Sequence, residues 1–298
     1  MKPKIDSQVL SVFKVLLAGI LFGTTGLAYK YAPEGSSPVT LGIMRLFIGS
    51  LFLILVLPPI DGSRRNILLL SKKPLVWVMA IFSASYQPFF FGATDRNGVA
   101  LSTLLTVGCI PIFTGLVGRI FLKEKIRVVW VLATLLAICG LIIRSWGQIE
   151  FNNLSGIFMS LAAGLSVSFY LNAAKVELRK GKYGMELPAM AYFLGSILLI
   201  PFLWGNSFSW VLQPQGFITA SYIGIVTMAI ANALQISGLR RLPPGPTATL
   251  MLADPFTATI LGVVVLHEKF GLLPFLGIAI VGFSIVWQSV AQVKSSYV

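Results

Sequence analysis

Two stretches of the sequence repeat one another, and this repeat decides the fold. The first runs from Gly108-Cys109-Ile110-Pro111-Ile112-Phe113-Thr114 to Leu122-Lys123-Glu124-Lys125, and the second from Leu252-Ala253-Asp254-Pro255-Phe256-Thr257 to Leu266-His267-Glu268-Lys269. Pro255 follows Pro111 by 144 residues, and Glu268 follows Glu124 by the same offset. A solenoid unit has only about 20–50 residues, so this repeat is far too long for one. We therefore expect two similar halves, at residues 1–150 and 151–298.

The composition excludes an ordinary soluble domain. Of the 298 residues, 56% are hydrophobic and only 11% are charged, whereas charged residues make up about a quarter of a soluble domain. The surplus apolar surface must therefore face lipid. A formal net charge of +13 would indicate nucleic acid as the partner of a soluble protein. Here the basic residues lie between apolar runs, which favours topology determinants beside anionic lipid and no nucleic-acid partner.

The sequence offers no framework for a disulfide, a metal or a cofactor. Cys109 and Cys139 lie inside apolar runs, so two cysteines support no disulfide scaffold. There is no C-x-x-C motif and no cluster of histidine and cysteine. We therefore expect neither a metal nor a cofactor. The first apolar run is too long for the hydrophobic region of a signal peptide, so we expect a retained first helix.

The apolar runs predict an all-α membrane protein with ten transmembrane helices. About 20 mostly apolar residues are needed to cross the hydrocarbon core of a bilayer. Short connections with glycine, proline and asparagine separate the runs. We place the helices at 11–31, 38–59, 74–94, 98–121, 127–145, 155–176, 187–205, 214–238, 244–266 and 272–292.

The distribution of lysine and arginine predicts which loops are cytoplasmic. With the N-terminus inside, the cytoplasmic segments hold sixteen of these residues, and the opposite segments hold four: Lys30, Arg96, Arg144 and Lys269. Ten spans return the C-terminus to the cytoplasm. Because each half has five helices, an odd number, the second half must be inserted upside down. The expected architecture is therefore two inverted five-helix repeats.

These motifs resemble the ten-helix drug/metabolite transporter superfamily, which is built from two EamA-type repeats. The first helix carries Leu21-Phe22-Gly23-Thr24-Thr25, similar to a small-residue run of the family, and the second carries Arg45 where the family places an arginine. The proline-containing runs and the Leu-x-Glu-Lys motifs follow in the fourth and ninth helices. The resemblance covers nearly the whole chain. It implies an exporter of amino acids, aromatic ones included, in the bacterial inner membrane.

Two charged side chains lie deep in the predicted spans, where charge is costly and marks function. Asp254 is about ten residues into the ninth helix, and Arg45 is about seven residues from the outer end of the second. Asp254 could bind a substrate ammonium or a proton, and Arg45 a substrate carboxylate. The alternatives are a structural hydrogen bond from Asp254, and an Arg45 side chain that extends to the interface or ties two helices together.

Three prolines, Pro88, Pro111 and Pro255, interrupt the third, fourth and ninth helices. Each lacks an N–H and frees the carbonyl four residues earlier. Free carbonyls are tolerated at membrane depth only where neighbouring groups or cavity water satisfy them. We therefore expect these three helices to line a cavity. A kink without ligand contact is the alternative for each proline taken singly.

Uncharged polar residues in corresponding regions of the two halves complete the candidate substrate-binding site. They are Tyr86, Gln87, Tyr170, Asn172, Asn232 and Gln235. Corresponding interruptions of two halves point to a transport site. The competing interpretation is interhelical hydrogen bonding for the amides and space filling for the tyrosines. The motifs Gly19-x-x-x-Gly23 and Gly164-x-x-x-Ser168 indicate close helix contacts.

The residues favour a carrier of small molecules over an enzyme or a channel. An enzyme would need a nucleophile with a base, or metal ligands, and the one histidine, His267, has no placed partner. A channel would use the same polar residues, but the inverted duplication favours alternating access. We keep two alternatives open: a broad-specificity drug/metabolite or nucleotide-sugar-type carrier, and a channel-like facilitator. We expect a monomer in the lipid bilayer.

Overall fold

The computed structural model describes residues 5–56, 67, 69–147, 153–181, 183–204, 207–267 and 271–294. Over these residues the chain forms helices and no strand. The first half contains α1 (Ile5–Gly23), α2 (Thr25–Lys30), α3 (Pro38–Val56), α5 (Pro74–Phe121) and α6 (Val128–Arg144). The second contains α7 (Leu154–Arg179), α8 (Glu186–Leu198), η1 (Ile200–Leu203), η2 (Ser209–Leu212), α9 (Pro214–Gly224), η3 (Ile225–Ile230), α10 (Ala231–Leu239), α11 (Pro244–Leu250), α12 (Ala253–Val264) and α13 (Leu272–Lys294).

Seven helical segments of the described chain are long and apolar enough to span a membrane, and two shorter apolar helices, α6 and α8, accompany them. One of the seven, α5, has 48 residues. At about 1.5 Å per residue it would extend over roughly 70 Å, more than twice the ~30 Å hydrocarbon core. Gly98 interrupts α5 with φ 72° and ψ 166°, a conformation open to glycine because it has no Cβ. The interruption falls where the sequence predicts the turn between two helices.

The predicted ninth helix, 244–266, is not continuous. Its first part, α11, ends at Leu250, and α12 begins at Ala253. Pro255 has no N–H to donate to the Met251 carbonyl, and this carbonyl instead accepts the N–H of Asp254 at 2.9 Å. The expectation that Pro255 leaves the Met251 carbonyl free is therefore wrong. A tight turn of the 3₁₀ type satisfies it within the chain.

Three other predicted helices also differ from the structure in detail. The first begins earlier, at Ile5, and is interrupted at Thr24 between α1 and α2. The seventh ends as an α-helix at Leu198 and continues as the 3₁₀ helix η1. The eighth contains η3, a π-helical segment between α9 and α10. Such segments are rare and frequently lie at functional sites.

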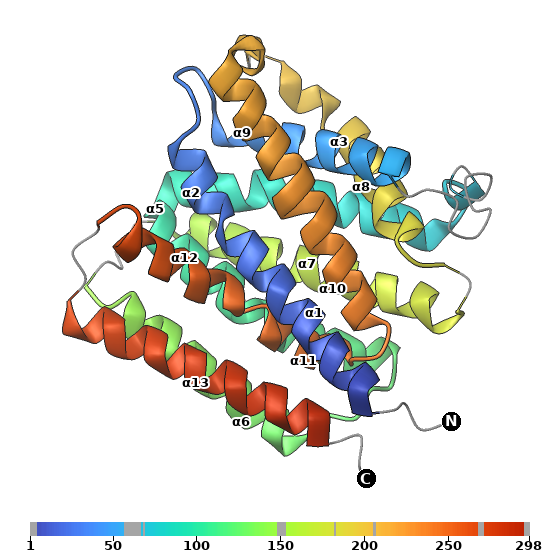
Figure 1. Ribbon diagram of the computed structural model, residues 1–298, viewed down its shortest axis with the longest axis vertical. Coiled ribbons are helices and arrows are strands. Elements are labelled where there is room, and N and C mark those ends of the chain that lie inside the picture. The colour runs from blue at the N-terminus through green and yellow to red at the C-terminus, as the bar shows by residue number, and fades with distance from the viewer. Residues whose placement is uncertain are drawn as a thin grey trace.

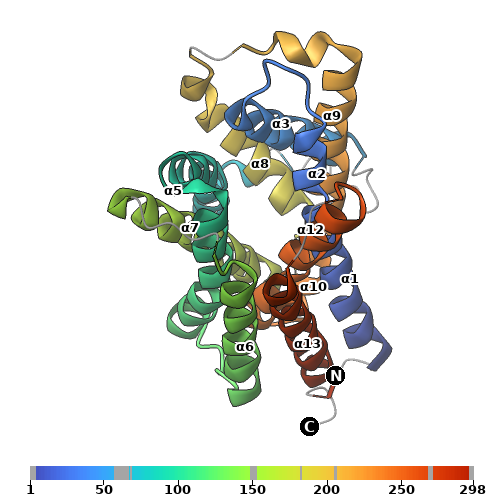
Figure 2. The ribbon, with the colours of Figure 1, turned by 90° about the vertical axis from the view of Figure 1, so that its left-hand side faces the viewer.

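The helices pack in close pairs that join distant parts of the sequence. In Figure 1, α6 lies along α13, and α1 lies along α10. Figure 2 shows α6 and α13 again side by side. A Cβ on Gly19 would lie 2.8 Å from the Cβ of Ala253, and one on Gly164 would lie 2.9 Å from the Thr106 carbonyl oxygen. These distances confirm the close helix contacts predicted at the two glycines.

Side-chain contacts bring the basic segments of the chain to one end of the bundle. Arg179 forms an ion pair with Glu124 at 2.7 Å, and Lys73 forms one with Glu177 at 3.6 Å. At the chain ends, the Gln8 side chain donates to the Gln292 carbonyl at 3.1 Å. Gln8 and Gln292 also line one pocket with residues 123–127 of the loop after α5, so the start of α1 and the end of α13 lie at this end of the bundle.

One position of the Leu-x-Glu-Lys motifs has the same backbone conformation in both halves, whereas Glu268 and Lys269 lie outside the described residues. Lys123 and His267, at matching positions of the repeat, have φ values of 55° and 52°, and no other non-glycine residue of the described chain has a positive φ. A residue in the left-handed conformation commonly ends a helix, and this position usually holds glycine or asparagine. The left-handed conformation at Lys123 and His267 is thus a repeated feature of the structure.

Candidate functional site

A cavity of about 180 Å³ lies between helices of both halves. It brings together seven of the eight residues predicted to form a binding site: Arg45, Tyr86, Gln87, Tyr170, Asn232, Gln235 and Asp254. Aromatic and aliphatic side chains, among them Phe22, Phe82 and Met228, form most of the remaining wall. An apolar pocket with a few convergent polar groups is the usual form of a small-molecule site.

Arg45 extends from α3 across to the second half of the chain. Its guanidinium donates to the Thr227 carbonyl at 3.2 Å, within the π-helical segment. The Cζ atom lies 5.3 Å from the centre of the Phe22 ring, a cation–π contact. Its Nε is buried without a hydrogen-bond partner. Arg45 therefore ties two helices together, as the alternative interpretation predicts, while its Nε–H has no acceptor among the described residues.

Asp254 lies in the first turn of α12, directly after the break in the ninth predicted helix. A carboxylate there is stabilised by the partial positive charge of the helix N-terminus, by about 0.3–1 kcal/mol at exposed sites. α1 packs tightly behind it, since a Cβ on Gly23 would lie 2.6 Å from the Asp254 carbonyl oxygen. The ion pairs of the described residues include neither Asp254 nor Arg45. Both charges of the cavity thus remain available to a ligand.

Two tyrosines form one wall of the cavity. The ring of Tyr170 stacks on Tyr192 with centroids 5.4 Å apart and planes 16° from parallel. The Tyr192 hydroxyl donates to the side-chain oxygen of Asn232, and the Asn232 amide donates to the Met228 carbonyl at 2.8 Å. Asn232 is therefore held by the protein and positions Tyr192, rather than offering free polar atoms.

The polar residues that line the cavity from α5 and α10 differ in their contacts with the rest of the protein. Gln87 is buried against α3, where a Cβ on Gly42 would lie 2.6 Å from its side-chain oxygen. Tyr86 stacks on Phe90 with centroids 5.5 Å apart. Gln235, also buried, lines the cavity from α10. These side chains supply the apolar and polar surface around the two charges.

Asn172 and the three prolines lie outside the lining of the cavity. The Asn172 amide donates to the carbonyls of Thr114 and Ser168, at 3.1 and 2.9 Å, and thus joins α7 to α5. This is the interhelical hydrogen bonding of the competing interpretation. The predicted helices that contain the prolines do contribute to the wall, through residues such as Val107 and Met251. α5 nevertheless continues through Pro88 and Pro111, and the residue that leaves the helical conformation is Gly98.

Sequence reasoning missed Tyr192, Phe22 and Met228 as members of the cavity wall. Tyr192 lies in an apolar helix next to Phe193, and nothing in the sequence separates a cavity-facing ring from a core-facing one. The π-helical segment that carries Met228 also has no sequence signature. Position in the repeat gives one usable signal, because Phe22 matches Val167, which lines the cavity as well.

Comparison with known proteins gives the same fold and a family. Over residues 9–146 and again over 154–290, the chain matches the EamA-like transporter family. It is 34% identical to the uncharacterized transporter YwfM of Bacillus subtilis over 96% of both chains. It is 24% identical to the threonine/homoserine exporter RhtA of Escherichia coli, over 86% of this chain and 83% of that one. A solved crystal structure shares the fold with a TM-score of 0.79 at 19% identity, over 96% of this chain and 97% of that chain.

The family matches cover most of the sequence, and the helical segments are those of a protein that crosses the membrane many times. The prediction of a transporter rather than an enzyme is confirmed by this family. The chain belongs to the EamA-like transporter family, within the drug/metabolite transporter superfamily, and is a multi-pass membrane transporter.

Proposed function

We propose that this transporter is a secondary carrier that exports small metabolites, most favourably amino acids and aromatic ones among them, by alternating access. The observation that carries the proposal is the cavity, in which Asp254 and Arg45 offer opposite charges beside three tyrosines. An amino acid has an ammonium and a carboxylate, so its binding requires both charges. Tyr86, Tyr170 and Tyr192 supply apolar contact for a side chain.

The architecture that we propose for this function has ten spans in two inverted halves, residues 1–150 and 151–298. Counting the two parts of α5 separately and adding α6 and α8 to the other long segments gives ten. Matching positions of the halves line the same cavity, as Val107 and Met251 do, and Ile110 and Asp254. These pairs support a two-fold relationship around the cavity.

Contacts between the last helices of the two halves support the inversion. Gly277 of α13 lies against Arg144 and Gly140 of α6, whereas Ser284 of α13 donates to the Ala133 carbonyl at 2.6 Å. Residue numbers thus rise along one helix as they fall along the other, so the two helices are antiparallel. Inverted repeats related by an axis in the membrane plane require this direction for corresponding helices at that axis.

The size of the cavity favours a small solute over a nucleotide sugar. Its volume of about 180 Å³ is below the roughly 300–1,000 Å³ of pockets for drug-sized ligands. The similarity to an exporter of threonine and homoserine supports amino acids as the substrate class. A broad-specificity or nucleotide-sugar-type carrier is the second candidate, and a channel-like facilitator the third.

Counterflow in proteoliposomes tests the proposal. Purified protein should exchange internal amino acids for external labelled ones, with saturation and with competition between related amino acids. Exchange of nucleotide sugars or organic cations without any amino acid would favour the broad-specificity carrier, and very fast, unsaturable flux would favour the facilitator. Asp254→Asn keeps the shape and removes the charge, so it should weaken amino-acid binding while the folded protein remains as stable. Asp95→Asn, the same change at an exposed position, is the matched control.

We further propose that both termini face the cytoplasm of a bacterial inner membrane and that the protein acts as a monomer. The excess of basic residues at the end that holds both termini supports this orientation. In a background without Cys109 and Cys139, Lys125→Cys should react with an impermeant thiol reagent only from the cytoplasmic side. Lys30→Cys should react only from outside. The reverse pattern would invert the proposed topology.

A further inference from the structure

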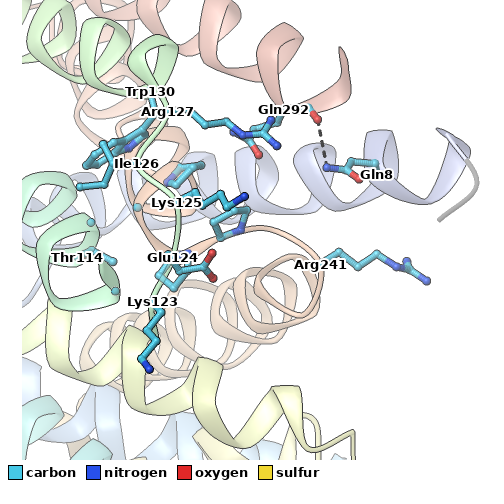
Figure 3. A pocket seen from close by; sticks show the side chains of 16 residues that line it. Gln8, Thr114, Lys123, Glu124, Lys125, Ile126, Arg127, Trp130, Arg241 and Gln292 are labelled. Carbon is cyan, nitrogen blue, oxygen red and sulfur yellow. Dashed lines mark hydrogen bonds between the residues drawn. The ribbon is translucent and has the colours of Figure 1, made fainter. Parts of the chain in front are cut away.

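A second pocket lies at the end of the bundle that holds the start of α1 and the end of α13 (Figure 3). Its volume is about 380 Å³, and it shares no lining residue with the cavity. Its walls come from the loop between α5 and α6, the start of α11, and the ends of α1 and α13, which Gln8 and Gln292 join. α11 separates the two sites, since its Gly245 faces this pocket and its Ala248 lines the cavity.

The pocket carries positive charge that the protein does not neutralise. Four cations line it: Lys123, Lys125, Arg127 and Arg241. The acid in the lining, Glu124, is already paired with Arg179. The ion pairs of the described residues involve Lys73, Arg179 and Lys180, and none of the four. Figure 3 shows Lys125 and Arg127 extending from the loop across the pocket. Charge of one sign in a concave site attracts a ligand of the opposite sign.

The N-terminus of α6 adds to this positive potential. α6 has 17 residues and begins at Val128, directly after the basic loop. Its N-cap residue, Arg127, makes no side-chain capping hydrogen bond. The free N–H groups and the dipole of a helix start favour an anion such as phosphate. The cations and the helix start therefore act at the same place.

An exposed apolar face continues from the pocket along α6. Ile126 and Val128 are 43% and 71% exposed, and Leu132 and Leu135 follow on the same helix at 46% and 52%. In a membrane protein such a face contacts acyl chains. A soluble phosphate compound would match the pocket alone, whereas a phospholipid matches the pocket with its headgroup and the apolar face with its chains.

We propose that this pocket binds the headgroup of an anionic phospholipid. Lys125, Arg127 and the start of α6 hold its phosphate, and the acyl chains lie along Val128 and Leu132. A cation near a membrane surface contributes about 1 kcal/mol to the binding of anionic lipid, which is about fivefold in affinity. Removing two of them should weaken the affinity about 25-fold.

The test uses the purified full chain in detergent, titrated with phosphatidylglycerol or phosphatidylcholine and followed by native mass spectrometry and thermal unfolding. The wild type should retain phosphatidylglycerol about tenfold more tightly than phosphatidylcholine, and added salt should reduce this preference. Lys125→Gln with Arg127→Gln should bind phosphatidylglycerol about 25-fold more weakly. Lys30→Gln with Lys72→Gln removes the same charge at two exposed positions outside the pocket and should bind like the wild type.

Three results would overturn the proposal. The first is equal affinity of the pocket variant and the control variant for phosphatidylglycerol. The second is stabilisation of the wild type by inorganic phosphate as strongly as by phosphatidylglycerol, which would assign the pocket to a soluble phosphate compound. The third result concerns the wild type alone. It is equal affinity for phosphatidylglycerol and phosphatidylcholine, or a preference for phosphatidylglycerol that added salt does not reduce.

Discussion

Lys175 provides the sharpest test of how α7 and α10, two helices of the second half, are held together. The sequence counts it among the cytoplasmic basic residues, yet its side chain is buried in α7. Its ammonium donates to three carbonyls at the end of α10 and in the following turn: Leu239 at 2.7 Å, Arg240 at 3.1 Å and Leu242 at 2.9 Å. An ammonium has three donors, and all three are used. We predict that Lys175→Met destabilises the protein strongly.

The magnitude follows from these three contacts. Each buried carbonyl left without a partner costs about 1–3 kcal/mol, and the last carbonyls of a helix also lose a favourable cation near the negative end of the dipole. The substitution by methionine also removes the desolvation penalty of a buried ammonium, several kcal/mol, and this gain offsets part of the lost stability. The net loss should be about 3 kcal/mol, in line with breaking a buried pair. By the scaling for domains of 150–250 residues, this lowers the Tm by about 6–12 °C.

Thermal unfolding of the purified protein, followed by size-exclusion chromatography after heating, measures this loss. Lys14→Met is the matched control, because Lys14 makes one hydrogen bond to a neutral hydroxyl, that of Ser237 at 2.9 Å. The control should lose less than about 1 kcal/mol. If Lys175→Met unfolds within about 2 °C of the control, the three carbonyl contacts contribute no net stability and the reasoning is refuted.

Three further substitutions test local features of the fold, each by the same thermal unfolding. Gly164→Val should destabilise by about 1–3 kcal/mol or more, because its side chain would collide with Cys109 on the neighbouring helix; an unchanged Tm would contradict the close contact. Lys123→Gly should stabilise by about 1 kcal/mol, since it relieves a left-handed backbone, and a loss would show that the lysine side chain outweighs the strain. Tyr192→Phe should cost about 1–2 kcal/mol by leaving Asn232 without its donor, and a neutral result would mean that Asn232 finds another partner.

The sequence could single out the charged residues that line the cavity, but it could not predict the partners of the polar residues. Asp254 and Arg45 were placed at depth by counting from helix ends, and both line the cavity. Gln87 and Asn172 look alike in the sequence, as buried amides on apolar helices. One lines the cavity and the other joins two helices. The difference depends on how the helices rotate about their axes when they pack, and periodicity does not determine this for helices that are apolar all round.

Helix interruptions were predictable only where a residue type causes them. Gly98 and Pro255 mark breaks that the sequence indicates, because glycine permits a departure from the helix and proline removes a backbone donor. Pro88 and Pro111 lie inside α5 without such a break. The π-helical segment at Ile225–Ile230 contains neither residue type. Within this segment the Thr227 carbonyl accepts a hydrogen bond from the distant Arg45 side chain, a contact that the local sequence does not indicate. Trp130 lies near the start of a predicted helix, where a tryptophan is expected at the membrane interface. This expectation is wrong, because the side chain is buried and its Nε1 donates to the Thr249 hydroxyl at 3.0 Å.

The repeat explains both why the cavity forms and why it is asymmetric. Ile110 and Asp254 occupy matching positions and line the cavity from opposite halves, so duplication alone would place the same chemistry on both walls. Only one wall carries the carboxylate. Two buried acids facing each other would repel and raise the cost of burying each charge, and a single acid with Arg45 avoids this. The repeat thus brings matching positions to one cavity, and the difference at this pair leaves a carboxylate on one wall only. In the function that we propose, this carboxylate receives the ammonium of an amino acid and Arg45 receives its carboxylate.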